Sequence, residues 1–402
     1  MTRHRNFLLS IAAALLSTVL ASGCATETRD DAKKAAVERW MQTRANLMYG
    51  VARQAFEVGE LDKSERTCRG VLAEEPLNLP FLKLWARIQI ERGQLEPAMA
   101  TLNHAAAVNE EDSETHYLLG LVNQRWQRYD EALLSYRKSY VFEPENVRGL
   151  LAVTEMLVKL DRVDEAIEGL EAKLVYFEYN AAVRVALGRI HALRGENTQA
   201  IHYYREASLL SPDDLQITEH LSRALLSDGQ HANAIDYLTQ LLADESYAQR
   251  RDIRADLAEA YMATNNVAKA RLIYLDLTRE APQIVDNWIK LGQAAWILGD
   301  DRRVAEAAER TIALDPDRYE GYLLRGMSTQ KAGDVGEALA FFKRASELEP
   351  NNPLPLVLQG MGFEQAGQPA AAAEAYNQAL RVAPDDVRAR HLLARLESDG
   401  DR

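Results

Sequence analysis

Apolar residues in the stretch 319–352 recur at the spacing of two short α-helices. Gly333 lies where the first helix would end, at a position that favours a left-handed backbone. Pro350 lies where the second helix must end, because proline has no N–H and restricts the residue before it. One face of the second helix carries Ala338, Phe341, Phe342, Ala345 and Leu348. A single helical hairpin cannot bury such a face alone, so the pattern predicts neighbouring copies.

The copies follow a period of 34 residues along most of the chain. Prolines recur two periods apart and later one period apart, at Pro76, Pro144, Pro212, Pro282, Pro316, Pro350 and Pro384. Ten units then begin at Ala45, Leu79, Ser113, Val147, Ala181, Leu215, Arg251, Val285, Tyr319 and Pro353. The seventh unit begins two residues late, which predicts a small insertion in the sixth, near Asp244–Arg250.

Three positions of the unit keep one kind of residue. The turn position suits a left-handed backbone, and it reads Gly59, Gly93, Gln127, Asp161, Gly195, Gly229, Asn265, Gly299, Gly333 and Gly367. The eighth position is always small, as is needed where the helices of a hairpin cross closely, and it reads Ala52, Ala86, Gly120, Thr154, Gly188, Ser222, Ala258, Gly292, Gly326 and Gly360. The twentieth position is alanine in eight units, and the exceptions are Ser64 and Val304.

This pattern resembles the tetratricopeptide repeat family, whose period is also 34 residues. The resemblance implies an all-α fold, namely a right-handed α-solenoid of about ten helix-turn-helix repeats over residues 45–386. Val387–Glu397 has the pattern of one more helix, with Leu392, Leu393 and Leu396 on its inner face. We therefore expect residues 387–402 to form a capping helix and a polar tail.

Residues 1–23 have the features of a targeting segment. Arg3 and Arg5 precede the apolar run Phe7–Leu20, which as a helix would span about 21 Å, less than a bilayer core of about 30 Å. The small residues before Cys24 resemble the bacterial lipobox. The resemblance implies a lipoprotein signal peptide that is cleaved before Cys24, with lipid attached to that cysteine. An ordinary signal peptide cleaved nearby is the alternative.

The stretch 24–44 is expected to be a lipid-anchored linker and a backward extension of the first helix, which begins near Asp31. Ala25 follows the cysteine, whereas aspartate there retains enterobacterial lipoproteins at the inner membrane. The resemblance therefore implies attachment to the outer membrane, facing the periplasm. Inner-membrane and surface-exposed placements remain as alternatives.

Composition and motifs narrow the function classes. A hydrophobic fraction of 47% and a charged fraction of 27% are typical of a folded protein. The net charge of −13 argues against nucleic acid as the main partner. The histidines form no metal-ligand spacing, and no nucleophile or phosphate-loop motif occurs. The sequence thus predicts no enzymatic activity, no cofactor and no metal site, and it predicts Cys68 to be a buried core thiol.

In the family, the first helices line a concave groove, into which their second, fifth, ninth, twelfth and thirteenth residues project. At these positions the first half of the chain carries Arg53, Arg87, Arg125, Arg189 and Arg223. The second half carries Met262, Ile289, Trp296, Ile297, Leu323, Met327, Leu354, Val357 and Met361. Arginine pairs with carboxylates and methionine suits apolar surfaces, so we expect a protein segment with an acidic and an apolar part. Alternatively, Glu155, Glu219 and Glu259 neutralise the arginines and Trp296 is packed.

The resemblance implies a non-catalytic scaffold, anchored to the bacterial envelope by lipid, that binds protein segments in its groove. Such a scaffold would support assembly of an outer-membrane, pilus, secretion or polysaccharide-export machine. The alternative is a regulatory adaptor of a peptidoglycan synthase or hydrolase.

Overall fold

The computed structural model describes residues 29–400, which form twenty-one α-helices and no strand. The all-α solenoid fold that the sequence predicts is thus confirmed. The chain divides into two compact units, Met1–Tyr176 and Phe177–Arg402. The predicted targeting segment 1–23 and Cys24 lie outside the described residues.

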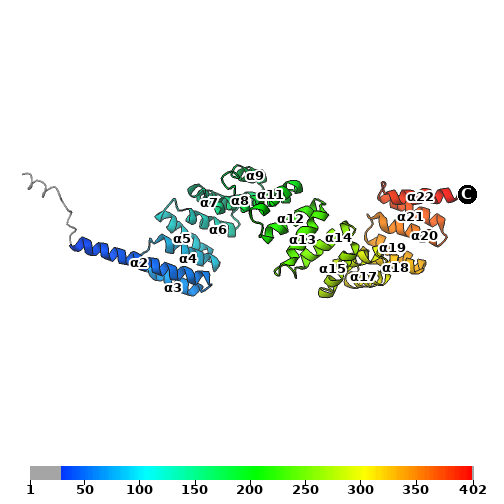
Figure 1. Cartoon of the computed structure of the whole chain (residues 1–402), viewed down its shortest axis with the longest axis horizontal. Coiled ribbons are helices and arrows are strands. Elements are labelled where there is room, and N and C mark those ends of the chain that lie inside the picture. Colours follow the sequence, from blue (N-terminus) through cyan, green and yellow to red (C-terminus); the bar gives the residue numbers. More distant parts are fainter. Residues whose placement is uncertain (1–28, 401–402) are drawn as a thin grey trace, which may run out of the picture. The chain divides into compact units, whose positions relative to one another are not determined.

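The first unit contains four repeats, each made of two helices joined by a tight turn (Figure 1). Each helix packs on the next, and α2 and α4 also contact the first helix of the following repeat. The helices are α2 (Arg29–Glu57), α3 (Leu61–Glu74), α4 (Leu79–Glu91), α5 (Leu95–Val108), α6 (Ser113–Arg125), α7 (Tyr129–Phe142), α8 (Val147–Lys159) and α9 (Val163–Glu171).

The second unit contains six repeats and one terminal helix. Its helices are α10 (Ala181–Leu193), α11 (Asn197–Leu210), α12 (Leu215–Ser227), α13 (His231–Ala243), α14 (Arg251–Ala263), α15 (Val267–Glu280), α16 (Val285–Ile297), α17 (Asp301–Leu314), α18 (Tyr319–Ala332), α19 (Val335–Leu348), α20 (Pro353–Gln365), α21 (Pro369–Val382) and α22 (Val387–Gly400). Leu392, Leu393 and Leu396 of α22 pack against the cluster that contains Ala379 and Tyr376 of α21, as the sequence predicts for a cap.

The turn position has a left-handed backbone in all ten repeats, which confirms its assignment. The φ angle is +96° at Gly333, the largest of the ten, and +58° at Asp161, the smallest. Glycine adopts this conformation without a steric cost, whereas other residues do so at a cost. The three other residues at this position are Gln127, Asp161 and Asn265.

The small eighth position lies at close crossings between helices. A Cβ atom added at Gly326 would lie 2.5 Å from Phe342 of α19, and one at Gly360 would lie 2.3 Å from Tyr376 of α21. Gly120 and Gly188 face Tyr136 and Tyr204 in the same way. At Gly292 the nearest atom belongs instead to Leu324, on the first helix of the next repeat.

In repeats whose eighth residue is larger than glycine, the residue sixteen positions after it is not aromatic, with one exception. These pairs are Ala52 with Cys68, Ala86 with Leu102, Thr154 with Leu170 and Ser222 with Leu238, and the exception is Ala258 with Tyr274. The two positions therefore share one volume between them.

The fourth repeat departs from the even pattern expected from the sequence. Its second helix, α9, ends after nine residues at Glu171, whereas the other second helices have 13 or 14. Hydrogen bonds to the third preceding carbonyl follow, for example from Lys173 N to Leu170 O at 3.0 Å. The next residues, 174–177, are Leu-Val-Tyr-Phe, a run with only one strong helix former, and they form turns.

Candidate functional site

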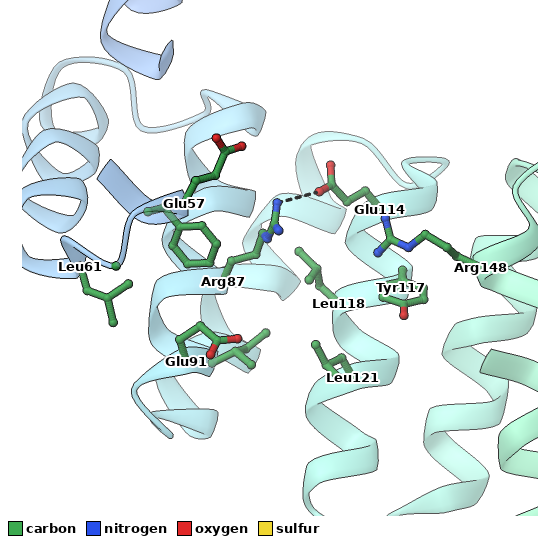
Figure 2. A pocket seen from close by; sticks show the side chains of 12 residues that line it. Glu57, Leu61, Arg87, Glu91, Glu114, Tyr117, Leu118, Leu121 and Arg148 are labelled. Carbon is green, nitrogen blue, oxygen red and sulfur yellow. Dashed lines mark ion pairs between the residues drawn. The ribbon is translucent and has the colours of Figure 1, made fainter. Parts of the chain in front are cut away.

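Four first helices of the first unit, α2, α4, α6 and α8, line a cavity of about 620 Å³ together with the start of α3 (Figure 2). The lining residues are Phe56, Glu57, Gly59, Leu61, Arg87, Ile90, Glu91, Glu114, Tyr117, Leu118, Leu121 and Arg148. Most of them occupy groove positions of the repeat, so the repeat itself brings them to one face.

Two guanidinium groups lie against aromatic rings of this cavity. The Arg148 guanidinium lies 4.4 Å from the centre of the Tyr117 ring, and that of Arg87 lies 5.1 Å from the Phe56 ring. Figure 2 shows Arg87 directed at Glu114, and the two charged groups are 3.9 Å apart. Stacking on a ring leaves the N–H edge of a guanidinium free to meet a carboxylate.

Glu114 is held in place mainly by Lys83, whose ammonium lies 2.9 Å from it and 3.0 Å from Asp112. Burial alone would lower the pKa of Lys83, but hydrogen bonds to both carboxylates outweigh it and raise that pKa. Asp112 also caps α6 by accepting a hydrogen bond from Thr115 N at 2.8 Å. Because Glu114 is already paired with Lys83, it neutralises only part of the positive charge of Arg87.

The inner wall of the cavity is apolar. Ile90 and Leu118 are 1% and 4% exposed, and Leu121 packs beside them. Arg125 contacts two residues of the lining, since its guanidinium donates to Ile90 O at 2.9 Å and lies 3.7 Å from Glu91. The cavity thus joins an apolar wall to two arginines and to the carboxylates of Glu57, Glu91 and Glu114.

Most of the predicted groove arginines have acidic partners. Arg53 pairs with Glu57 at 2.7 Å, while Arg87 and Arg125 pair as described. In the second unit, Arg223 pairs with Glu219 and Asp252 at 3.0 Å and 2.9 Å, and Arg189 is exposed on α10. The alternative of neutralised arginines therefore holds for most of them, although of the three expected glutamates only Glu219 takes part.

The predicted apolar groove residues of the second unit divide into three groups. Ile289, Leu323 and Val357 are 3%, 9% and 2% exposed, which places them in the core and corrects their assignment to the groove surface. Met262, Trp296, Met327 and Leu354 are partly buried against core clusters. The exposed members are Ile297 and Met361.

The predicted insertion in the sixth repeat places the guanidinium group of Arg250 against the Glu219 carboxylate. Arg250 forms two hydrogen bonds with the Glu219 carboxylate, at 2.6 Å and 2.9 Å, and Tyr247 adds a third at 2.9 Å. Burial would raise the pKa of Glu219, but these hydrogen bonds and the nearby arginines lower it. The inserted residues therefore form a network of charged side chains with α12 and α14, and the 34-residue pattern does not predict this network.

Of the twelve residues that line the cavity, only Arg87 was a predicted site residue. Those that sequence reasoning missed include Phe56, Tyr117, Leu121 and Arg148. All four occupy groove positions, the twelfth, fifth, ninth and second of their repeats. A search of these positions for aromatic and arginine residues would have found Phe56, Tyr117 and Arg148.

Other features bear on chemistry and location. In residues 29–400, no group of histidine, cysteine or acidic residues could hold a metal ion. Burial raises the pKa of the Cys68 thiol to about 12, so this thiol is neutral in the folded protein. Across the same described range, no helix has the length and apolar character that a membrane crossing requires.

Three models of the tetratricopeptide repeat match this chain, and together they cover more than half of it. The matched residues are 55–122, 225–291, 289–353 and 355–396.

Individual proteins are more distantly similar. The bovine (Bos taurus) BBSome complex member BBS4 is 27% identical over 152 residues, which is 38% of this chain and 28% of the bovine protein. The C-terminal part of a repeat protein from Cytophaga hutchinsonii is 16% identical with a TM-score of 0.48, over 60% of this chain and 99% of that one. A repeat protein from Parabacteroides merdae is 13% identical with a TM-score of 0.43, over 79% and 98%.

Proposed function

Since this chain belongs to the tetratricopeptide repeat family, whose fold is a scaffold for protein–protein interaction, we propose that it captures a partner segment in the cavity of the first unit. The observation that carries this proposal is the pairing of an apolar wall with two ring-stacked arginines. The bovine relative is named as a member of a complex.

The segment best suited to the cavity has an apolar residue next to an acidic one. A cavity of about 620 Å³ lies within the range of about 300–1,000 Å³ in which sites for small ligands fall, so it holds only a few side chains. The apolar side chain would pack on Leu118 and Leu121. A neighbouring carboxylate would then pair with Arg148 and with Arg87.

A photo-crosslinking amino acid at Leu121 tests this proposal in cells. We expect one set of crosslinked partners, which Arg148→Glu removes and Arg66→Glu keeps. Arg66 is a matched control because it is an exposed arginine on α3, outside the lining. Capture that persists in Arg148→Glu, or is lost equally in Arg66→Glu, would exclude the cavity as the binding site.

We further propose that the scaffold is anchored by lipid at Cys24 to the outer membrane and faces the periplasm. The support is the leader-like segment 1–23 and the small residues before Cys24. Cys24→Ser should release the protein from sedimented membranes, because a lipid-modified cysteine is then missing. Continued sedimentation of this variant with membranes would contradict the anchor.

The crosslinked partners also distinguish the two envelope roles. Components of a pilus, secretion, outer-membrane or polysaccharide-export machine would support the assembly scaffold. A peptidoglycan synthase or hydrolase would support the regulatory adaptor instead.

A further inference from the structure

The first helix of the first unit is unlike the other first helices. Helix α2 has 29 residues, whereas α4, α6 and α8 have 13 each. Its N-terminal half extends beyond α3 and α4 (Figure 1), and every residue from 36 to 44 is exposed. This half is about 15 residues long, a length at which an isolated helix is only marginally stable in water, so a contact along it would stabilise it.

The exposed face of α2 continues into the first repeat. In later repeats the third residue of the first helix packs on the second helix of the preceding repeat, as Phe81 packs near Val71 and Ile253 near Leu241. Phe81 and Ile253 are 1% and 0% exposed. The equivalent residue of α2 is Leu47, which is 69% exposed. The surface that a preceding helix covers elsewhere is therefore open here within the described residues.

Apolar residues on this face follow the spacing of a helix–helix seam. Val37, Trp40, Leu47 and Val51 recur at intervals of three, seven and four residues, and they are 48%, 60%, 69% and 40% exposed. We call these four residues the α2 seam. Arg44 would interrupt it, but its guanidinium is turned aside to pair with Glu74 of α3 and to lie 5.6 Å from the Trp40 ring.

Small residues border the α2 seam. Ala36, Thr43 and Gly50 lie seven residues apart along one side. No atom lies within 4 Å of a Cβ built at Gly50, so nothing in the described chain requires glycine there. Glycine destabilises a helix interior relative to alanine. A close approach from another molecule would make use of the missing side chain.

The order of residues along the α2 seam lets two antiparallel copies of α2 fit against each other. When two α2 helices run antiparallel about a point between Thr43 and Arg44, Trp40 lies opposite Leu47 of the second copy. Val37 then lies opposite Gly50, and Ala36 opposite Val51, so in these two pairs a larger residue meets a smaller one. Apart from Arg44, whose charge is paired with that of Glu74, the residues that flank the seam are uncharged, and they are Ala36, Met41, Thr43, Met48 and Gly50. Two chains of net charge −13 could thus approach here without direct repulsion between side chains.

We propose that two copies of this protein pair through antiparallel α2 helices, along the α2 seam. The pairing would supply each first repeat with the covering helix that the later repeats have. One helix pair buries less surface than the roughly 1,600 Å² of a standard complex, so we expect the pairing to be weak and reversible.

Cysteine crosslinking in the full chain tests both the pairing and its direction. Cys24→Ser is included in every variant, and the remaining thiol, Cys68, is buried. A chain with Val37→Cys mixed with a chain with Gly50→Cys should form a disulfide-linked dimer under mild oxidation. Each of these chains alone should form little, because the two cysteines then lie at opposite ends of the seam. The control is Gln42→Cys, which is exposed on the opposite face of α2.

Sedimentation velocity of the same full chain gives a second measurement. Trp40→Glu should weaken self-association at least about tenfold, since Trp40 belongs to the α2 seam and is 60% exposed in the single chain. Gly50→Leu should weaken it too, although an added side chain meets nothing within one chain. Crosslinking of Val37→Cys with itself would mean parallel pairing and overturn the proposal. A monomer at about 100 µM, or unchanged association in Trp40→Glu, would overturn it as well.

Discussion

Replacing Gly326 with alanine should destabilise the repeat formed by α18 and α19 by about 1–3 kcal/mol. The added Cβ would lie 2.5 Å from Cε1 and 2.7 Å from Cδ1 of Phe342. Phe342 is 0% exposed, so its ring cannot move into solvent without losing its buried contacts. Either the ring or the helix must shift, and both responses cost packing energy.

Phe342→Leu should partly rescue this loss. Alone it leaves a void beside Gly326 and costs about 1 kcal/mol or more. Combined with Gly326→Ala, it recreates the pair that the second repeat uses, Ala86 with Leu102, both of which are 0% exposed. The double variant should therefore be more stable than the sum of the single losses by about 1–2 kcal/mol, as expected for residues in contact.

Native-state hydrogen exchange measures these free energies repeat by repeat, which suits long repeat arrays because they need not unfold in one step. Amides of α18 and α19 report the effect, and those of α12 and α13 serve as the internal reference. Additive losses, with a coupling below about 0.5 kcal/mol, would refute the idea that the two positions share one volume. The Phe342 ring would then shift to make room for the added Cβ, as a ring already does beside an alanine in the pair of Ala258 with Tyr274.

Three further predictions concern other positions. Gln127→Gly should stabilise the third repeat by about 1 kcal/mol in the same exchange measurement, because Gln127 has a φ of +60°; no gain would show that Gln127 is unstrained. The pKa of Glu219 is lowered below its ordinary 4.5, so its contribution to stability is present above that pH and is lost as the pH falls further; the free energy of opening in α12 and α14, obtained from exchange after correction for the slower intrinsic rate at low pH, should fall on acidification, and Glu219→Gln should remove this dependence. Cys68 should react with thiol reagents at pH 8 only as fast as its repeat opens, because burial raises its pKa to about 12; a rate like that of a free thiol would contradict its burial.

The sequence by itself determined the repeat, its turns and the helix crossings. These features depend on local conformation and on one recurring volume, so a residue type at a fixed spacing is enough to predict them. Gly333 illustrates the first dependence, since its left-handed φ follows from its place at the turn. Gly326 illustrates the second, because a small residue there leaves room for the Phe342 ring. The targeting segment and Cys24 rest on the sequence alone.

Tertiary structure alone decided which groove residues can meet a partner. Ile289 has the same repeat position as Tyr117, yet it is buried whereas Tyr117 lines the cavity. Arg223 has the same position as Arg87, but it lies 2.9 Å from Asp252 on the next first helix, whereas Arg87 lies 3.9 Å from Glu114, which Lys83 also holds. The exposure of such a residue, and whether its charge is neutralised, depend on how far the side chains of neighbouring helices reach. The position within the repeat does not determine which side chains those are.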